Sequence, residues 1–372
     1  MKKIGIFIND FSEGGVEFVL INLANQLETS KYSVSLICLN NRGPLIKKVK
    51  PHVKIINLSS SSLSSGIPKL YHFLKENKLD LFITGKTYIN IVSVILCKVF
   101  LKQKLLITEH TVLSLNSKYA NGFKMKYIIP FLARLFLKRA DMVISVSKGV
   151  EKDLIENYNV KSSKVSTIYN PVITQEFSER LNDEVVDFHF TNNKKYIISV
   201  GRLVYSKRID LLIDAFLLVK QSMNDVHLII IGDGSELENL KKQVSDYGID
   251  ESVSFLGFKE NPLPYIKQSD VFVLTSDYEG FGNVLVEALY CETPVISSNC
   301  LSGPSEILED GKYGILINHQ NPKEYSEQII KILSEEQMLD ASYKNRAYDF
   351  YDSKIIGQYE EIIDKLIRKR GC

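Results

Sequence analysis

Short, fully apolar runs that alternate with helix-like patterns are the feature that most constrains the fold of this chain. Runs such as "KIGIFIN", "YSVSLICL", "LDLFITG", "KLLITEH" and "ADMVISVS" are each followed by a loop or by a helical pattern such as "VEFVLINLANQLE". Strands that are apolar on both faces are typical of parallel sheets with helices on each side. The sequence therefore predicts an α/β fold.

The alternation restarts in the second half of the chain, with "KYIISVGRL", "RIDLLIDAFLLVKQ", "VHLIIIGDG", "SVSFLGF" and "DVFVLTS". Two such sets in 372 residues predict two doubly wound domains, in line with a prior of about 150 residues per domain. We place the hinge at Asn170-Pro171, because a residue that precedes proline favours extended geometry. The predicted domains are residues 1–172 and 173–351, and a C-terminal helix over 352–372 is expected to pack back on the first.

Composition excludes several classes of protein. A net charge of +2 does not favour a nucleic-acid partner. The five cysteines are scattered without a C-x-x-C pair, which indicates reduced thiols in a cytosolic protein, and the six dispersed histidines form no local metal-ligand cluster. The N-terminal apolar run is too short for a secretory signal, and no apolar stretch approaches the roughly 18–20 residues that span a bilayer.

The loops that follow the strands are the candidate binding loops, because ligands of open α/β sheets bind beyond the carboxyl ends of the strands. These loops are "NDFSEGGVE", "TEHT", "VGRLVYSK", "IGDGSE" and "TSDYEGFGN", and glycines and charges concentrate in them. A cleft between the two domains would gather all five.

Three of these loops carry cations or glycines suited to anions. Gly14 and Gly15 precede a helix, where backbone N–H groups approach an anion closely, although a plain glycine turn is the alternative. Arg202 and Lys207 follow a strand and suit a diphosphate, although either could be an ordinary surface side chain. His110 ends a strand, a position that favours function over the structural role that lone histidines more often have.

The stretch "DYEGFGNVLVEALY" places Glu279 in a loop and Glu287 on the second turn of a helix. Gly280 to Asn283 fall between them at the helix N-terminus, where backbone N–H groups bind phosphate. Two carboxylates on either side of a phosphate site fit a ligand with sugar hydroxyls at both ends. Solvated glutamates are the alternative, which is weak for Glu287 because the surrounding face is apolar.

At this point the residues resemble a known family. "EGFGNVLVE" is similar to the E-x7-E motif of retaining glycosyltransferases of family 4, and "EGGVE", "YNPV", "GRL....K" and "IGDG" accompany it in order over nearly the whole chain. The segment "SSNCLSGPSEILEDGKYGILI" is similar to that of a subgroup that builds bacterial surface glycans. The resemblance implies the GT-B fold, with two Rossmann-like doubly wound domains facing a central cleft.

The resemblance also implies residue roles. Gly14 and Gly15 would face the donor diphosphate, Arg202 and Lys207 would neutralise it as it leaves, and His110 would lie near the sugar. Glu279 would contact the donor hexose and Glu287 the ribose hydroxyls. The implied catalytic residues are Glu279, His110, Arg202 and Lys207; the implied donor-binding residues are Gly14, Gly15, Arg202, Lys207, Gly257, Phe258, Glu279, Gly280, Phe281, Gly282, Asn283, Val284 and Glu287.

The implied function is that of a retaining hexosyltransferase. It would move a hexose or N-acetylhexosamine from a nucleotide sugar, with UDP preferred to GDP-mannose, to a lipid-linked or polysaccharide acceptor in the synthesis of lipopolysaccharide, capsule or glycoprotein glycan. The chain has no D-x-D triplet, and we expect neither a metal nor a cofactor besides the nucleotide sugar. The alternatives are a GT-B-fold UDP-sugar epimerase and an inactive sugar-nucleotide-binding subunit, whereas a nicotinamide dehydrogenase is disfavoured because its glycine fingerprint is absent.

Residues 121–141 mix five basic side chains with aromatic and aliphatic ones, a composition that suits docking on anionic lipid. The tail "KLIRKRGC" forms a second basic cluster. The alternative is a helix whose apolar side faces the core and whose basic side is solvated. We therefore expect a cytoplasmic enzyme that is peripheral at the inner face of the cytoplasmic membrane.

Overall fold

The structure is a computed structural model that describes residues 1–12, 14–120, 122–319, 321–335 and 342–368. The chain divides into two compact units, the first formed by Met1–Pro171 with Asp352–Cys372 and the second by Val172–Tyr351. Within the described ranges, none of the helices has the length and apolar character that crossing a membrane requires.

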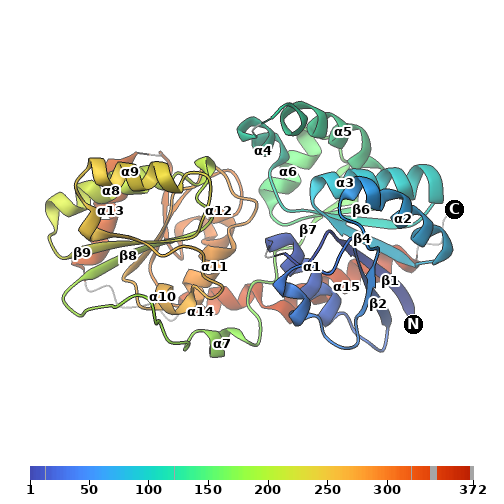
Figure 1. The fold of residues 1–372 in the computed structure, drawn as a ribbon, viewed down its shortest axis with the longest axis horizontal. Helices are drawn as coiled ribbons and strands as arrows, with labels where there is room; N and C mark the ends of the chain where they lie inside the picture. Colours follow the sequence, from blue (N-terminus) through green and yellow to red (C-terminus); the bar gives the residue numbers. More distant parts are fainter. Residues whose placement is uncertain (13, 121, 320, 336–341, 369–372) are drawn as a thin grey trace. The chain divides into compact units, whose positions relative to one another are not determined.

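The first unit is built on a seven-stranded sheet with the strand order β3-β2-β1-β4-β5-β6-β7 (Figure 1). All neighbouring strands are parallel, as in the pairing of β1 with β2 and β4. The strands are β1 Lys2–Ile8, β2 Tyr32–Cys38, β3 Lys54–Asn57, β4 Leu81–Gly85, β5 Leu105–Glu109, β6 Met142–Ser145 and β7 Val165–Thr167.

The helices of the first unit cover both faces of this sheet. They are α1 Gly15–Gln26, α2 Leu63–Glu76, α3 Thr87–Val94, α4 Leu113–Tyr119, α5 Ile129–Phe136, α6 Lys148–Glu156 and α15 Asp352–Arg368, with short 3₁₀ or π segments at Pro44–Lys48, Ile95–Leu101, Lys124–Ile128, Leu137–Arg139 and Ser162–Lys164.

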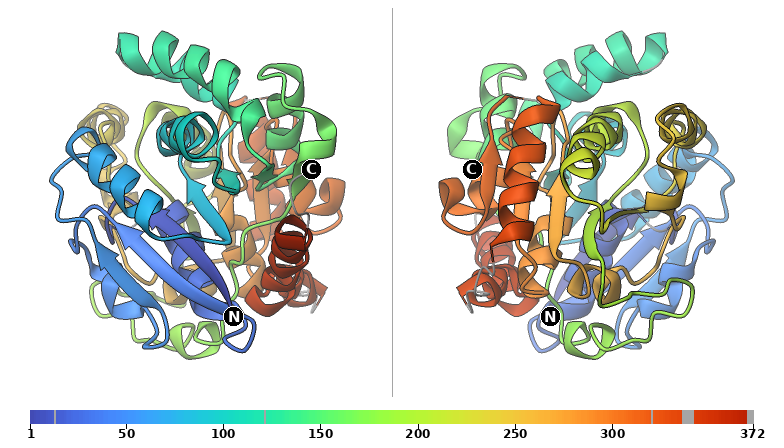
Figure 2. Two further views of the ribbon diagram at one scale, coloured as in Figure 1. Left: turned by 90° about the vertical axis from the view of Figure 1, so that its right-hand side faces the viewer. Right: turned by 90° about the vertical axis from the view of Figure 1, so that its left-hand side faces the viewer.

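Helix α15, which comes from the end of the chain and is dark red in Figure 2, contributes buried side chains to the core of the first unit. The buried side chains of Ile355, Tyr359 and Ile363 join the same apolar cluster as β1 and α1. The hydroxyl of Tyr32 donates a hydrogen bond of 2.7 Å to Asp364. Burial of one apolar stripe thus explains why a helix joins a sheet from which the second unit separates it in sequence.

The second unit has a six-stranded parallel sheet with the order β10-β9-β8-β11-β12-β13. Its strands are β8 Lys195–Val200, β9 Val226–Ile231, β10 Val253–Phe255, β11 Val271–Leu274, β12 Val295–Ser298 and β13 Ile315–Ile317. Its helices are α7 Phe177–Arg180, α8 Ile209–Ser222, α9 Leu237–Asp246, α10 Leu263–Lys267, α11 Asn283–Tyr290, α12 Pro304–Ile307, α13 Pro322–Ser334 and α14 Ser342–Ala347, with 3₁₀ turns at Tyr205–Lys207, Asp250–Ser252, Glu309–Gly311 and Tyr348–Phe350.

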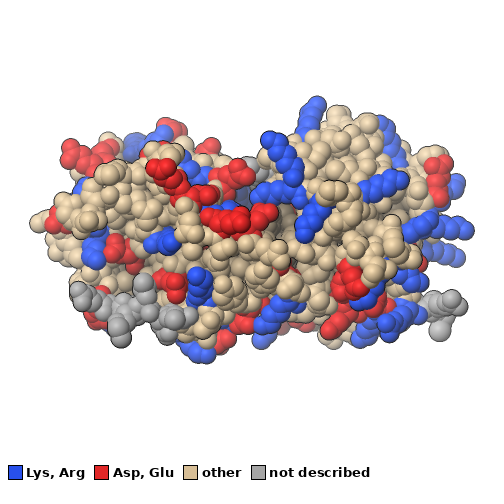
Figure 3. Space-filling view, turned by 90° about the horizontal axis from the view of Figure 1, so that it is seen from below, with Lys and Arg blue, Asp and Glu red and all other residues tan. Residues whose placement is uncertain are grey.

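The predicted α/β fold with parallel sheets is confirmed. The side chains of β9 and β11 are buried along their whole length, as expected for strands covered on both faces. Basic and acidic side chains both appear on each unit in the view of Figure 3, in keeping with the small net charge. In each unit the loops after the strands gather at the carboxyl edge of the sheet, and the candidate residues lie in these loops or at the start of the helices that follow them.

Candidate active site

A buried ion pair joins two loops of the second unit. Lys207 lies in the 3₁₀ turn after β8, and Glu279 lies in the loop after β11. Lys207 Nζ donates to Glu279 Oε1 at 2.5 Å, and Ser276 Oγ donates to the same oxygen at 2.7 Å. The two side chains are only 19% and 9% exposed. Two residues predicted to act on the donor, 72 positions apart, are thus in direct contact.

The glycine loop after Glu279 leads into helix α11 through a left-handed residue. Gly282 has a φ of 99° and precedes the first helical residue, Asn283, without a side-chain cap. Only glycine adopts this conformation at little cost. The first N–H groups of a helix have no partner within the helix, and they carry its partial positive charge. This segment and Val284, at the start of α11, therefore have the geometry expected of a phosphate site.

The segment after β12 packs against the loop of Gly280 to Gly282 and supports it. Ser302 Oγ donates to the carbonyl of Gly280 at 2.9 Å. A Cβ on Gly303 would lie 1.8 Å from the carbonyl oxygen of Phe281, so a side chain at residue 303 would displace the loop. The Phe281 ring is buried against Phe350, with ring centroids 5.4 Å apart.

Glu287 lies on the second turn of α11, as the sequence predicts. Its side chain is half-buried, and burial raises the pKa of its carboxyl, while Arg180 opposes the shift. Hydrogen-bond donors that replace water would stabilise the charged form of a carboxyl in such surroundings. Hydroxyl groups of a ligand would supply such donors.

The loops after β8, β9 and β10 are joined through their backbones. Leu203 N donates to the carbonyl of Asp233 at 2.9 Å, and Gly232 N donates to that of Gly257 at 2.8 Å. Gly257 has a φ of 68°, and the neighbouring Phe258 side chain is 58% exposed. Arg202 is exposed and forms no ion pair within the part of the chain that the structure describes. The aromatic ring and the guanidinium are therefore accessible to a ligand.

In the first unit, Gly14 and Gly15 mark the start of α1. Gly14 precedes the helix and Gly15 is its first residue, whereas Glu13 lies outside the described residues. A Cβ on Gly14 would lie 2.3 Å from Glu17 Oε2, so this glycine makes room for the Glu17 carboxylate. Glu17 forms a buried ion pair with Lys86. Sequence reasoning missed this pair, although "EGGVE" contains the glutamate.

His110 follows β5 and is neutral at physiological pH. Its Nε2 lies 2.8 Å from Thr108 Oγ1, which donates its own proton to the carbonyl of Thr84. Nε2 must therefore carry the imidazole proton, which leaves Nδ1 as a hydrogen-bond acceptor. Burial lowers the pKa of His110 to about 4, and the charge of Lys86 adds to the shift.

The preceding residue, Glu109, has its side chain fully buried. It accepts hydrogen bonds from Asn90 Nδ2 at 2.7 Å and from Thr87 Oγ1 at 3.0 Å. Burial raises the pKa of its carboxyl to about 7. The "EH" pair thus combines a buried carboxyl at the last residue of β5 with a neutral imidazole at the residue that follows it.

Comparison with known proteins identifies the family. The model for glycosyl transferases group 1 matches residues 183–350, and the model for Glycosyltransferase Family 4 matches residues 13–176. An uncharacterized glycosyltransferase of Methanocaldococcus jannaschii is 30% identical over 343 residues, which are 80% of this chain and 82% of that protein. A 4-alpha-N-acetylgalactosaminyltransferase of Campylobacter jejuni, which acts on a diphospho-undecaprenol glycan, is 29% identical over 93% of this chain and 94% of its own.

Solved structures show the same fold at lower identity. HepE of Anabaena, in complex with UDP and glucose, superposes with a TM-score of 0.77 at 22% identity over 98% of this chain and 100% of that one. Sucrose-phosphate synthase of Thermosynechococcus elongatus gives 0.79 at 19% identity and covers both chains fully. The predicted fold class and the predicted enzyme class, a hexosyltransferase, are confirmed. The chain belongs to the family 4 glycosyltransferases, which have the GT-B fold.

Proposed function

We propose that this enzyme transfers a hexose or N-acetylhexosamine, with retention of anomeric configuration, from a UDP-sugar to a lipid-linked or polysaccharide acceptor during surface-glycan synthesis. The observation that carries the proposal is the buried Lys207–Glu279 pair beside the Gly280–Gly282 loop. A cation, a carboxylate and a helix N-terminus at one sheet edge match the diphosphate and the sugar hydroxyls of such a donor.

The relatives support the donor and acceptor classes. The Campylobacter jejuni relative, by its name, adds N-acetylgalactosamine to a diphospho-undecaprenol glycan, and a relative from Erwinia amylovora, 26% identical over 98% of this chain, takes part in amylovoran biosynthesis. HepE was solved with UDP-glucose. A UDP-activated sugar and a lipid-linked glycan acceptor are therefore the first substrates to test.

In the proposed reaction the acceptor hydroxyl attacks the anomeric carbon from the side that the leaving group occupies. The bond between that carbon and the diphosphate oxygen breaks, and the leaving phosphate accepts the hydroxyl proton. Lys207, Arg202 and the N-terminus of α11 would stabilise the charge that develops on the diphosphate. Glu279 would accept hydrogen bonds from the donor hexose and Glu287 from the ribose. His110, through Nδ1, would accept one from a sugar hydroxyl.

Lys207 and Arg202 would make a metal ion unnecessary for the transfer reaction. Transfer should persist at full rate in excess EDTA, because Lys207 and Arg202 supply the positive charge that Mg²⁺ supplies elsewhere. Loss of activity in EDTA that Mg²⁺ restores would contradict this part of the proposal.

A surface of the first unit suits peripheral contact with an anionic membrane. Along η3 (Lys124–Ile128) and α5, the side chains of Phe123, Tyr127 and Phe131 are 72%, 55% and 62% exposed. The surrounding basic residues are all exposed: Lys124, Lys126, Arg134, Lys138 and Arg139. Exposed aromatic rings among cations favour the interface of an anionic bilayer over an ordinary core-facing helix. Asn121 and residues 369–372 of the predicted basic surfaces lie outside the described residues.

Liposome flotation tests the membrane contact. Wild-type protein should bind vesicles that contain anionic lipid at low salt, and substitution of Tyr127 and Phe131 by serine should abolish binding that Tyr348→Ser, an exposed tyrosine of the second unit, leaves intact. Absence of binding by the wild type at low salt would refute the contact.

A panel of nucleotide sugars tests the activity. Thermal stabilisation by a UDP-sugar, and transfer from it to undecaprenyl-diphosphate-linked glycans, are the expected results. Formation of an epimerised nucleotide sugar without an acceptor would identify an epimerase instead. Binding without any turnover would identify an inactive binding subunit.

A further inference from the structure

The loop that carries Lys207 makes a sharp turn at the next residue, Arg208. This residue has φ 50° and ψ 42°, the left-handed conformation, and it connects the 3₁₀ turn Tyr205–Lys207 to α8. Residues other than glycine adopt this conformation at an energetic cost. The side-chain contacts of Arg208 offset that cost.

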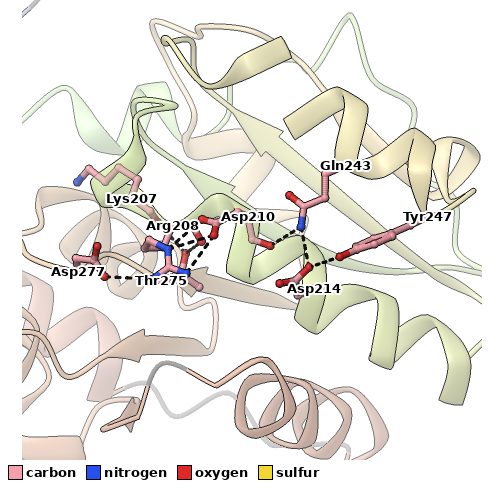
Figure 4. A network of polar contacts seen from close by, with 8 residues as sticks. All are labelled: Lys207, Arg208, Asp210, Asp214, Gln243, Tyr247, Thr275 and Asp277. Atoms are coloured by element: carbon pink, nitrogen blue, oxygen red, sulfur yellow. Dashed lines mark hydrogen bonds and ion pairs between the residues drawn. The ribbon is translucent and has the colours of Figure 1, made fainter. Parts of the chain in front are cut away.

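The guanidinium of Arg208 holds two carboxylates (Figure 4). Nε and Nη2 donate to Asp210 on α8 at 3.1 to 3.2 Å, and Nη1 lies 3.5 Å from Asp277 Oδ1. Asp277 is two residues before Glu279 and only 14% exposed. Arg208 therefore connects the loop that carries Lys207 to the loop that carries Glu279.

Three further hydrogen bonds join the same loops through backbone groups. The hydroxyl of the buried Thr275 donates to the carbonyls of Lys207 and Arg208 at 2.9 and 2.8 Å. Asp277 N donates to the carbonyl of Ser206 at 2.8 Å. Each residue from 275 to 277 thus contacts either the turn at 206–208 or Glu279, because Ser276 donates to Glu279.

We propose that Arg208, with Thr275 and Asp277, is a positioning residue that holds Lys207 and Glu279 in register for the transfer step. This inference rests on the proposed function. Arg208 would touch neither the donor nor the acceptor; it would fix the peptide from which Lys207 reaches the diphosphate. A displacement of about 1 Å at a reacting group costs up to about a hundredfold in rate.

The variant Arg208→Gly separates the backbone from the side chain, because glycine keeps the left-handed turn without strain while both ion pairs are lost. We expect kcat to fall about ten- to a hundredfold with little change in the donor KM, the pattern of an interaction needed in the transition state. Arg208→Lys, which keeps the charge, should recover part of kcat. Thr275→Val removes one hydroxyl and should give the same kcat-specific loss.

The same helix offers a matched control, also drawn in Figure 4. Asp214 on α8 accepts hydrogen bonds of 2.7 Å from Gln243 and from the hydroxyl of Tyr247. Gln243 also donates to the carbonyl of Asp210 at 3.0 Å, whereas the Tyr247 hydroxyl donates to Asp214. Tyr247→Phe should therefore lower stability slightly and leave kcat unchanged.

The outcomes are distinct. If wild-type protein transfers sugar and both Arg208→Gly and Thr275→Val keep normal kcat, the positioning role is overturned while the proposed function stands. If each variant, Tyr247→Phe included, loses activity only in proportion to its loss of stability, the role is merely structural and the proposal is again overturned. If Arg208→Gly does not fold, Thr275→Val and Asp277→Asn decide. Failure of the wild type to transfer from any nucleotide sugar is a failure of the proposed function.

Discussion

The Lys207–Glu279 pair makes a quantitative prediction about stability that is separate from activity. Both side chains are mostly buried, at 19% and 9% exposed, and among the described residues Glu279 keeps only the Ser276 hydroxyl as a partner when Lys207 is removed. Removal of one partner of a fully buried pair costs about 3–5 kcal/mol, and the residual exposure here reduces the expected cost to about 2–3 kcal/mol. Lys207→Met and Glu279→Gln should each show this loss.

The double variant should be much more stable than the sum of the single losses predicts, because no uncompensated charge remains. We expect a coupling energy of about 2 kcal/mol, at the upper end of that found for residues in contact. Hydrogen–deuterium exchange of peptides from β11 and α11 along a urea series would measure it within the second unit alone, which matters because a chain of two units does not unfold in two states.

Activity, unlike stability, should show no recovery in the double variant. All three variants should lose transfer, since none keeps both the cation and the carboxylate, even though the double variant loses less stability than the two single losses add up to. A coupling energy near zero would refute the reasoning, because it would mean that the two side chains do not pair in solution. Near-normal turnover in either single variant would show that the pair is not part of the chemistry.

Two further predictions concern single residues. Gly303→Ala should impair UDP-sugar binding and should lower stability by about 1–3 kcal/mol more than Gly311→Ala does. Both glycines have positive φ, but of the two only a Cβ at 303 would meet another atom, the carbonyl of Phe281. Equal effects of the two variants in a thermal-shift titration would contradict the proposed support of the loop. The raised pKa of Glu109, about 7 against an ordinary 4.5, means that native protein holds a proton that unfolded protein releases, so this group's stabilisation is full below pH 4.5 and is lost as pH rises through 7. Glu109→Gln should therefore make the slope of the unfolding free energy against pH more positive, by at most about 1.4 kcal/mol per pH unit. The slope is measured between pH 5 and 7 from hydrogen exchange of β5 peptides. An unchanged slope would show that Glu109 is ionised in the native protein throughout this range.

The strands, the two doubly wound sheets and the loops that hold the candidate residues could be predicted from the sequence, because apolar runs and the carboxyl-edge rule depend on local pattern. Glu279 in a loop and Glu287 on the second turn of α11 follow from the same local reasoning. The contact between Lys207 and Glu279 could not, since it depends on how two loops of adjacent strands fold against each other. The ion pair of Glu17 with Lys86 escaped prediction for the same reason.

The glycines of "IGDG" show a second limit. Helix α9 begins after Glu236 without a side-chain cap, and Asp233 Oδ1 accepts a hydrogen bond from Gly234 N. A Cβ on Gly232 or Gly234 would lie 1.8 or 2.2 Å from the carbonyl oxygens of Gly201 and Leu203. These glycines are required by the close approach of two loops, which no local pattern contains.

The pairing of Lys207 with Glu279 also changes how the two residues can work. The family resemblance implies that the lysine contacts the diphosphate and the glutamate contacts the hexose, as two independent contacts. An ammonium has three N–H groups, and one of them suffices for Glu279, so Lys207 can bind phosphate oxygens without breaking the pair. In the proposed function, Glu279 would then position the lysine as well as bind the sugar. Because the carboxylate is buried with its partner, the geometry of the cation is set before the donor arrives, which is the preorganisation that electrostatic stabilisation of a leaving group requires.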